Sequence, residues 1–530
     1  MSNWAYFTQL APEWILLIGA CGVLFAGGAR SRATAALGSV VTVLAALVAS
    51  LMQGVPEGEF NTLGLWLTPV TYYTRTIALA VGLTVVLVNW HQPAISERGE
   101  YLSMILFSLL GVLLTASAND VVVLFFAIEL VSVPTYVLVG LSQADARASE
   151  AAVKYFFLGA LAAALLAYGL SFWYGAAGTT TMHRLLGGNM TSTLPMDAGT
   201  GGYALIGFLL VLAALAFKVA AVPLHAYAPD VYEGAAAPVT GFLGFAPKLA
   251  GFVALIKVFS ACSWQFPNAV FWLVWAMAAA TMTTGNVLAL LQHNVKRILA
   301  YSSIAHSGYM LIGLLVGPAA GEGPLRDGVA AILFYVAVYA TMNLGAFALL
   351  SAFRNGEKPV ETLEDLHGLS DRAPMAALAF AICVFSLMGL PPTAGFLGKV
   401  YVFGSAFSSG ENHEFHEALV ALAIIGVVNS AIGAAYYLRI VAAAYIPRAE
   451  SRLAAIGGIP VRLGLGLCAL PLLLFFGWPA GLADRSRIAA SVAAQSLASR
   501  QESTSYAAAP AAEAGSGRSK TTDKSLQSGH

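Results

Sequence analysis

Charged side chains are scarce in this chain of 530 residues. Asp, Glu, Lys and Arg make up 10% of it and hydrophobic residues make up 58%, whereas about 25% of a typical soluble domain is charged. A soluble fold of this size cannot keep so much apolar surface out of water. The composition therefore excludes a soluble enzyme and predicts an all-α protein that crosses a membrane many times.

The sequence also lacks an excess of basic residues and a cysteine motif. With 27 basic and 27 acidic residues the net charge is zero, so nothing suggests a nucleic acid as a partner. Cys21, Cys262, Cys383 and Cys468 lie far apart in or beside apolar runs, without a CxxC pair or a Cys/His cluster. We expect them to be small core residues, and we expect no metal, haem or iron–sulfur site on this chain.

Apolar runs long enough to cross a bilayer recur along the sequence. About 20 such residues span a hydrocarbon core of about 30 Å. The first run lacks a basic leading region and contains Glu13, so we expect no cleavable signal peptide. The sequence predicts fourteen spans: 13–29, 33–52, 74–90, 101–118, 120–140, 149–176, 203–229, 237–260, 269–292, 295–317, 327–353, 374–405, 415–446 and 462–482.

The basic residues between these spans indicate the orientation. The even-numbered loops contain three, Arg75, Arg184 and Arg326. The odd-numbered loops contain twelve: Arg30, Arg32, Arg98, Arg147, Lys296, Arg297, Arg354, Lys358, Arg372, Arg448, Arg452 and Arg462. Basic loops stay in the cytoplasm, so we expect the odd-numbered loops there. With an even number of spans, both termini then lie on the periplasmic side of a bacterial inner membrane.

A few ionisable residues lie deep inside the spans, where a charge is costly and usually functional. They are Glu129, Lys218, Lys248, His306 and Lys399. Glu129 follows the start of its span by nine residues, which places it about 13 Å deep in a helix. A buried histidine can also be an ordinary core residue. Other lysines, Lys154 and Lys257, lie nearer span ends, where a long side chain can reach the interface.

Together these residues suggest a relay for protons. Burial disfavours the charged form of an ionisable group, so buried lysines and a carboxylate can gain and lose protons near neutral pH. Glu129 beside Lys218 would form an adjustable pair. The sequence does not show whether the two side chains touch.

Helix-breaking residues occur next to two of the lysines. Pro223 and Pro229 follow Lys218, and Gly389, Pro391, Pro392 and Gly395 precede Lys399. We expect the seventh and twelfth spans to be broken, although Pro and Gly are common in membrane helices. Spaced five spans apart, the breaks suggest an inverted repeat.

The sequence therefore divides into five segments. We expect a three-helix segment over 1–100, a first repeat over 101–260, a second over 269–446 and a final span over 462–482. Residues 483–530 form a polar Ala- and Ser-rich tail, in which 484–500 could be a short surface helix and 501–530 read as disordered.

Four stretches carry a family resemblance: FFAIELVSVPTYVLVG, KVAAVPLHAYAPDVYEGAAAPVTGFL, KRILAYSSIAHSGYMLIG and SLMGLPPTAGFLGKVYVF. They resemble subunit N of the proton-pumping NADH–quinone oxidoreductase, respiratory complex I, one of the antiporter-like subunits related to Mrp-type antiporters. The resemblance covers spans 4–13. DVYEG favours subunit N over its sisters, as does Lys399, where subunit M has Glu.

The resemblance implies fourteen helices with two inverted five-helix repeats and one proton channel in the membrane arm. NADH, FMN, iron–sulfur clusters and quinone would be held by partner subunits, with no cofactor and no redox centre on this chain. The other partners would be the sister antiporter-like subunits, small membrane subunits and the lipid bilayer. Two alternatives stay open: an antiporter subunit of an Mrp-type or hydrogenase-linked complex, and a structural subunit with an inactive channel.

The resemblance also implies proton-relay roles for six residues. Glu129 and Lys218 would be the paired residues, Lys248 the central lysine, His306 a connecting histidine, Lys399 the terminal exchange lysine and Lys154 a further lysine of the sixth span. The long tail after the last span carries no motif of the family.

Overall fold

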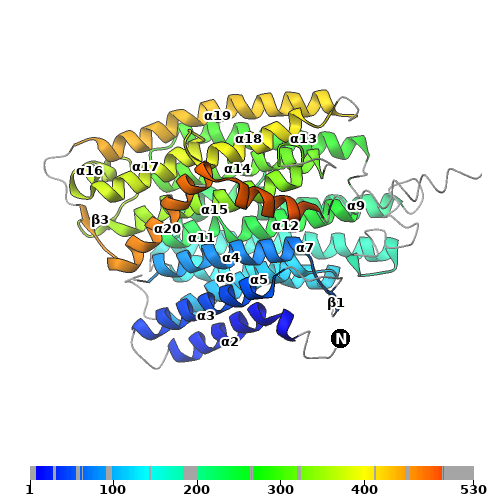
Figure 1. Cartoon of the computed structure of the whole chain (residues 1–530), viewed down its shortest axis with the longest axis horizontal. Coiled ribbons are helices and arrows are strands. Elements are labelled where there is room, and N and C mark those ends of the chain that lie inside the picture. Colours follow the sequence, from blue (N-terminus) through cyan, green and yellow to red (C-terminus); the bar gives the residue numbers. More distant parts are fainter. Residues whose placement is uncertain are drawn as a thin grey trace, which may run out of the picture.

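The predicted helical membrane fold is confirmed: long apolar helices run alongside one another through most of the chain (Figure 1). We analysed a computed structural model, which describes residues 7–27, 32–54, 60–62, 64–90, 98–142, 145–182, 201–262, 264, 267–318, 324–410, 414–447, 453–491 and 493. The tail predicted over 501–530 lies outside these residues.

The helices are bounded as follows: α2 (Ala11–Gly27), α3 (Arg32–Gln53), α4 (Pro69–Val88), α5 (Arg98–Ser117), α6 (Val121–Leu141), α7 (Ala146–Ala177), α9 (Gly201–Lys218), α10 (Tyr227–Gly234), α11 (Ala237–Leu243), α12 (Ala246–Ala261), α13 (Asn268–Leu290), α14 (Val295–Val316), α15 (Gly328–Ala352), a 3₁₀ turn η1 (Glu364–Leu366), α16 (Leu369–Arg372), α17 (Pro374–Met388), α18 (Ala394–Phe407), α19 (His416–Tyr445) and α20 (Gly458–Gly477).

Each of the fourteen predicted spans overlaps one or two of these helices. Within the described ranges, eleven spans are long and apolar enough to cross a membrane. The first, seventh and twelfth predicted spans coincide with shorter apolar helices, Ala11–Phe25, Gly202–Lys218 and the pair Pro374–Met388 and Ala394–Phe407. The total of fourteen crossings and the inverted repeat stay predictions.

Both expected helix breaks are present. The seventh span stops at Lys218 and helix resumes with α10 at Tyr227, while the twelfth divides between α17 and α18. Gly389 caps α17 in the left-handed conformation, with φ of +84°, which glycine adopts without steric cost. The two prolines that follow cannot donate a backbone hydrogen bond, so the helix cannot continue through them.

Short strands close the two ends of the bundle. Strands β1 (Phe60–Thr62) and β2 (Leu65–Leu67) pair antiparallel, and β3 (Phe353–Asn355) pairs with both β4 (Lys358–Pro359) and β5 (Leu453–Ala455). β1 lies at the right-hand end of Figure 1, whereas β3 and α16 lie at the left-hand end. The odd-numbered loop that contains β3 and β4 is thus opposite the even-numbered loop that contains β1.

The interior helices are α12, α14 and α15. In the most apolar 18-residue stretch of each span, all residues of Ala237–Ala261 are buried. The buried share is 94% in α14 and α15 but 33% in α7 and α19. A helix that is apolar on all sides is typical of a position with neighbours all round. Lys248 lies on α12 and His306 on α14, and Lys399 lies on α18, which packs against α14 and α15. Protein rather than lipid therefore surrounds these three side chains.

Two features differ from the prediction. Arg75 is not a loop residue: it lies inside α4, fully buried, and its Nε donates to Glu13 Oε1 at 2.8 Å. A buried arginine is tolerated because this carboxylate pairs with it. The short helix considered over 484–500 is present but begins earlier, because residues 480–491 are helical after a break at Trp478 and Pro479.

Candidate functional site: a buried row of ionisable side chains

Glu129 and Lys218 form an ion pair between α6 and α9. Lys218 Nζ lies 3.1 Å from Glu129 Oε1, and the two side chains are 6% and 18% exposed. The same ammonium donates to Ser132 Oγ at 2.7 Å and to Tyr136 OH at 3.4 Å. Ser132 and Tyr136 follow Glu129 by three and seven residues, so all three project from one face of α6. This pair is the contact that the sequence left open.

The break after Lys218 exposes backbone groups that neighbouring helices satisfy. Val219 C=O accepts from Ser307 Oγ at 2.6 Å, and Val222 N–H donates to Thr281 Oγ1 at 2.9 Å. Broken helices are tolerated inside a membrane only where protein or water provides such partners. Gly251 of α12 allows the close approach, because an added Cβ would lie 2.7 Å from Val219 Cγ1.

Lys248 on α12 is linked to this break through Ser307. Its Nζ donates to Ser307 Oγ at 2.8 Å and also to the Ser303 carbonyl. It lies 5.4 Å from the centre of the Tyr339 ring, where the face of an aromatic ring attracts a cation. Lys248 is 2% exposed. A hydroxyl therefore connects the central lysine to the backbone beside Lys218.

His306 on α14 lies between the two lysines of the second half of the row. Its Nδ1 is 2.7 Å from Tyr335 OH and its Nε2 is 3.0 Å from Tyr437 OH. Its ring centre is 5.0 Å from that of Tyr339 and 5.6 Å from that of Tyr309. Both nitrogens thus have a hydroxyl partner, and aromatic rings connect the histidine to each lysine.

Lys399 on α18 uses the second helix break directly. Its Nζ donates to Met388 C=O at 2.7 Å and to Ser430 Oγ at 2.8 Å, and it lies 5.3 Å from the Tyr309 ring centre. Met388 ends α17, so its carbonyl has no partner within the helix. A Cβ at Gly389 would lie 2.8 Å from Lys399 Cδ. The glycine that ends the helix therefore also leaves room for the lysine.

Lys154 is the one candidate that the structure places apart from the row. It is 43% exposed and pairs with Glu150 at 2.7 Å and with Asp230 at 3.1 Å. These partners belong to a surface region at one end of the bundle, so Lys154 does not contact the buried groups.

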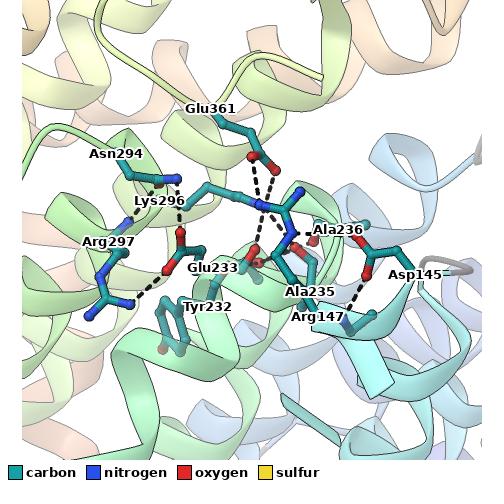
Figure 2. Close-up of polar contacts among 12 residues, drawn as sticks. Asp145, Arg147, Tyr232, Glu233, Ala235, Ala236, Asn294, Lys296, Arg297 and Glu361 are labelled. Carbon is teal, nitrogen blue, oxygen red and sulfur yellow. Dashed lines mark hydrogen bonds and ion pairs between the residues drawn. The ribbon is translucent and has the colours of Figure 1, made fainter. Parts of the chain in front are cut away.

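Asp230 belongs to an ion cluster that the sequence analysis did not anticipate. Figure 2 shows its other members, Glu233, Lys296, Arg297 and Glu361. Arg297 pairs with Asp230 at 3.1 Å and with Glu233 at 2.6 Å, both from the DVYEG stretch on α10. The buried Lys296 pairs with Glu361 at 2.8 Å and donates to Glu233 C=O at 2.6 Å. The cluster joins the start of α14 to the end of α10 and thereby fixes the second part of the broken seventh span.

The loop that carries Glu361 is itself held by Asp365. The Asp365 carboxylate accepts from the Thr362 N–H at 2.9 Å, from the Glu361 N–H at 3.2 Å and from Asn355 Nδ2 at 2.9 Å. Partial burial raises the pKa of Asp365, but these hydrogen bonds outweigh it and lower the pKa below its usual value. A charged Asp365 therefore stabilises the loop.

Comparison with known proteins identifies the family. The family described as NADH:quinone oxidoreductase/Mrp antiporter, transmembrane, matches residues 118–432. The NADH-quinone oxidoreductase subunit N of Methylobacterium nodulans is 38% identical over 497 residues, which are 92% of this chain and 97% of that protein. This chain belongs to the antiporter-like membrane subunits of that family.

Another relative and a solved structure support the same family assignment. Subunit N of Rhodospirillum rubrum is 36% identical over 492 residues, with 90% of this chain and 96% of that protein covered. A chain of respiratory complex I from Thermus thermophilus with bound aureothin is 30% identical in sequence to this chain. It superposes with a TM-score of 0.72, covering 88% of this chain and 97% of that one. Within the family, this chain thus groups with subunit N.

Several residues of this antiporter-like site were missed in the sequence. Ser303 and Tyr309 lie three residues before and after His306, so helical spacing from a known candidate could have indicated them. Lys296 and Arg297 were counted only as orientation signals, although the acidic residues of DVYEG offered partners. In the described part of the chain, no three His, Cys, Asp or Glu side chains are placed to share a metal ion.

Proposed function

We propose that this chain provides one proton pathway in the membrane arm of a bacterial NADH–quinone oxidoreductase, driven by quinone reduction elsewhere in the complex. The similarity to subunit N proteins supports the assignment to this complex. The row Glu129, Lys218, Lys248, His306 and Lys399 supports the pathway, and the ion pair between Glu129 and Lys218 is the observation that carries it.

In this proposal the lysines hold the proton and their partners control its release. A buried ammonium is costly unless a charge or hydrogen bonds compensate it. Lys218 keeps its proton while Glu129 is near and can release it when the pair separates. Lys248 receives the proton, His306 connects the two halves and Lys399 exchanges it at the far end. Lys154, exposed and ion-paired, would act only at the margin of this pathway.

The redox chemistry would take place on partner subunits, which hold NADH, FMN, iron–sulfur clusters and quinone. We place the chain in the bacterial inner membrane with both termini on the periplasmic side, next to the sister antiporter-like and small membrane subunits. The basic residues of the odd-numbered loops support this orientation. The burial of Arg75 removes one basic residue from the even-numbered loops and increases the contrast.

The alternative is an antiporter subunit of an Mrp-type or hydrogenase-linked complex, since the family description includes Mrp antiporters. The names of the subunit N relatives favour the oxidoreductase. Mass spectrometry of the subunits that co-purify with this chain decides between them, because only the oxidoreductase brings quinone-site and NADH-oxidising subunits with it.

The direct test replaces Lys248 by Met in the complete complex. Methionine keeps an unbranched side chain but cannot carry a proton. With the complex reconstituted in vesicles, we expect fewer protons moved per quinone reduced, and a slower coupled reaction. The control is Lys358→Met, because Lys358 is exposed on β4 and lies outside the row. An unchanged proton-to-quinone ratio in Lys248→Met would refute the proposed pathway.

A further inference from the structure

A groove of about 710 Å³ opens on the side of the bundle beside α4, away from the buried row. Its walls come from the end of α3, the first turns of α4, the end of α20 and the helical residues 480–491. α4 and α20 lie against each other in the bundle (Figure 1). Most of the lining side chains are apolar, among them Leu51, Ile77, Leu474 and Leu482.

The wall formed by residues 480–491 results from the break at Trp478 and Pro479. Beyond the break, this helix buries Ser486, Ala489 and Ala490 against the bundle. Gly481, Arg485 and Ile488 lie on another face of the helix, at spacings of four and three residues, and line the groove. The break thus separates α20 from the helical residues 480–491, and the groove lies beside this break.

The groove has the length of one lipid leaflet. It follows α4 from Pro69 to Ala80, and eleven residues of helix rise by roughly 16 Å. Half of a hydrocarbon core of about 30 Å is about 15 Å. Because α4 is a candidate membrane span beginning at Pro69, the Pro69 end lies at a membrane boundary and the Ala80 end near the middle of the bilayer.

Arg485 supplies a positive charge to this otherwise apolar groove. It is exposed and lines the groove together with Tyr72, in the first turn of α4. Among the residues that the structure describes, no carboxylate forms an ion pair with Arg485. A guanidinium binds phosphate oxygens in a bidentate manner, and basic pockets between membrane helices bind lipid head groups.

We propose that this groove binds one phospholipid, with its phosphate on Arg485 and one acyl chain along α4 toward Ala80. Length, apolar lining and the position of the charge agree with this ligand. For a neighbouring subunit or the chain beyond residue 493 to fill the groove instead, it would need a carboxylate for Arg485 near the membrane boundary and an apolar segment along α4.

The test is photolabelling of the purified complex with phosphatidylglycerol that carries a diazirine on its acyl chain. We expect label on peptides containing Tyr72 to Ala80 and Leu474 to Ile488. Arg485→Gln should reduce this labelling at least about tenfold, as expected for the loss of a charge-assisted hydrogen bond. Arg487→Gln is the matched control, because Arg487 is exposed on the same helix and does not line the groove.

Filling the groove provides an independent second variant. A Cβ at Gly481 meets no atom within 4 Å, so Gly481→Leu should occupy the space without a clash and abolish the labelling. Gly466→Leu on α20, where an added Cβ also meets nothing and which does not line the groove, should keep it. Labelling that persists in both Arg485→Gln and Gly481→Leu would overturn the proposal. So would a photo-crosslinker at Ile488 that captures protein instead of lipid.

Discussion

Removing the charge of Glu129 tests the coupling between the ion pair and proton transfer. At the observed 3.1 Å, Coulomb's law gives an attraction of about 5 kcal/mol for an effective dielectric constant near 20. Moving one charge against 100 mV requires about 2.3 kcal/mol, so making and breaking this contact can change the proton affinity of Lys218 by more than this step requires. Glu129→Gln keeps a hydrogen-bond acceptor and loses only the charge.

We therefore expect Glu129→Gln to lower coupled turnover roughly 50-fold, the rate factor that corresponds to about 2.3 kcal/mol. The assay is NADH-driven quinone reduction with proton pumping in energised membranes. Glu129→Asp should be milder, because the charge stays on a shorter side chain. Glu357→Gln, at an exposed position, is the control and should be neutral.

A double-mutant cycle completes this test. Lys218→Ala should be at least as severe as Glu129→Gln, and the double variant should be no worse than Lys218→Ala alone. Losses that add fully would show two independent sites, since residues in contact are not additive. That result would refute the paired mechanism, although the ion pair itself would remain.

Three further predictions follow from other parts of the molecule. Lys399→Ala should leave the complex assembled and lower the number of protons pumped per electron, so a normal ratio would contradict its exchange role. Reporter fusions after residue 493 should be active in the periplasm, and activity only in the cytoplasm would overturn the orientation. Asp365→Asn should lower the thermal stability of the complex at pH 7 by about 1 kcal/mol, as for the loss of a helix-capping carboxylate. Because the folded pKa of Asp365 is lowered, its stabilisation is present above the usual carboxyl range and disappears as the pH falls through the folded value. The difference between variant and parent should therefore shrink in acid.

The positions of the helices and of the buried charges could be predicted because both depend on local sequence. A hydrophobic run of sufficient length forms a span, and a lysine within it stands out regardless of its neighbours. Glu129 and Lys218 were found in this way. Their contact could not be predicted, since 89 residues separate them and only the tertiary fold brings the Lys218 side chain at the end of α9 to Glu129 on α6.

Other site residues are indistinguishable from ordinary core residues in the sequence. Tyr335, Tyr339 and Tyr437 occur in apolar runs, where an aromatic residue is expected for packing alone. The hydroxyls of Tyr335 and Tyr437 and the ring of Tyr339 matter only because α14 places His306 among them. Arg75 shows the opposite error: a charged residue near a span end was interpreted as a loop residue, and only the position of Glu13 on α2 explains its burial.

The end of α17 gives the two ends of the row different electrical characters. Lys218 faces Glu129, whose charge disappears when the carboxylate binds a proton. Lys399 faces the Met388 carbonyl at a helix C-terminus, where backbone dipoles maintain a permanent partial negative charge of about half an electron. That partner cannot be protonated at any working pH. Protonation of Glu129 can therefore weaken the hold on Lys218. The partial charge beside Lys399 is constant, so Lys399 leaves its carbonyl partner only if the lysine side chain itself moves.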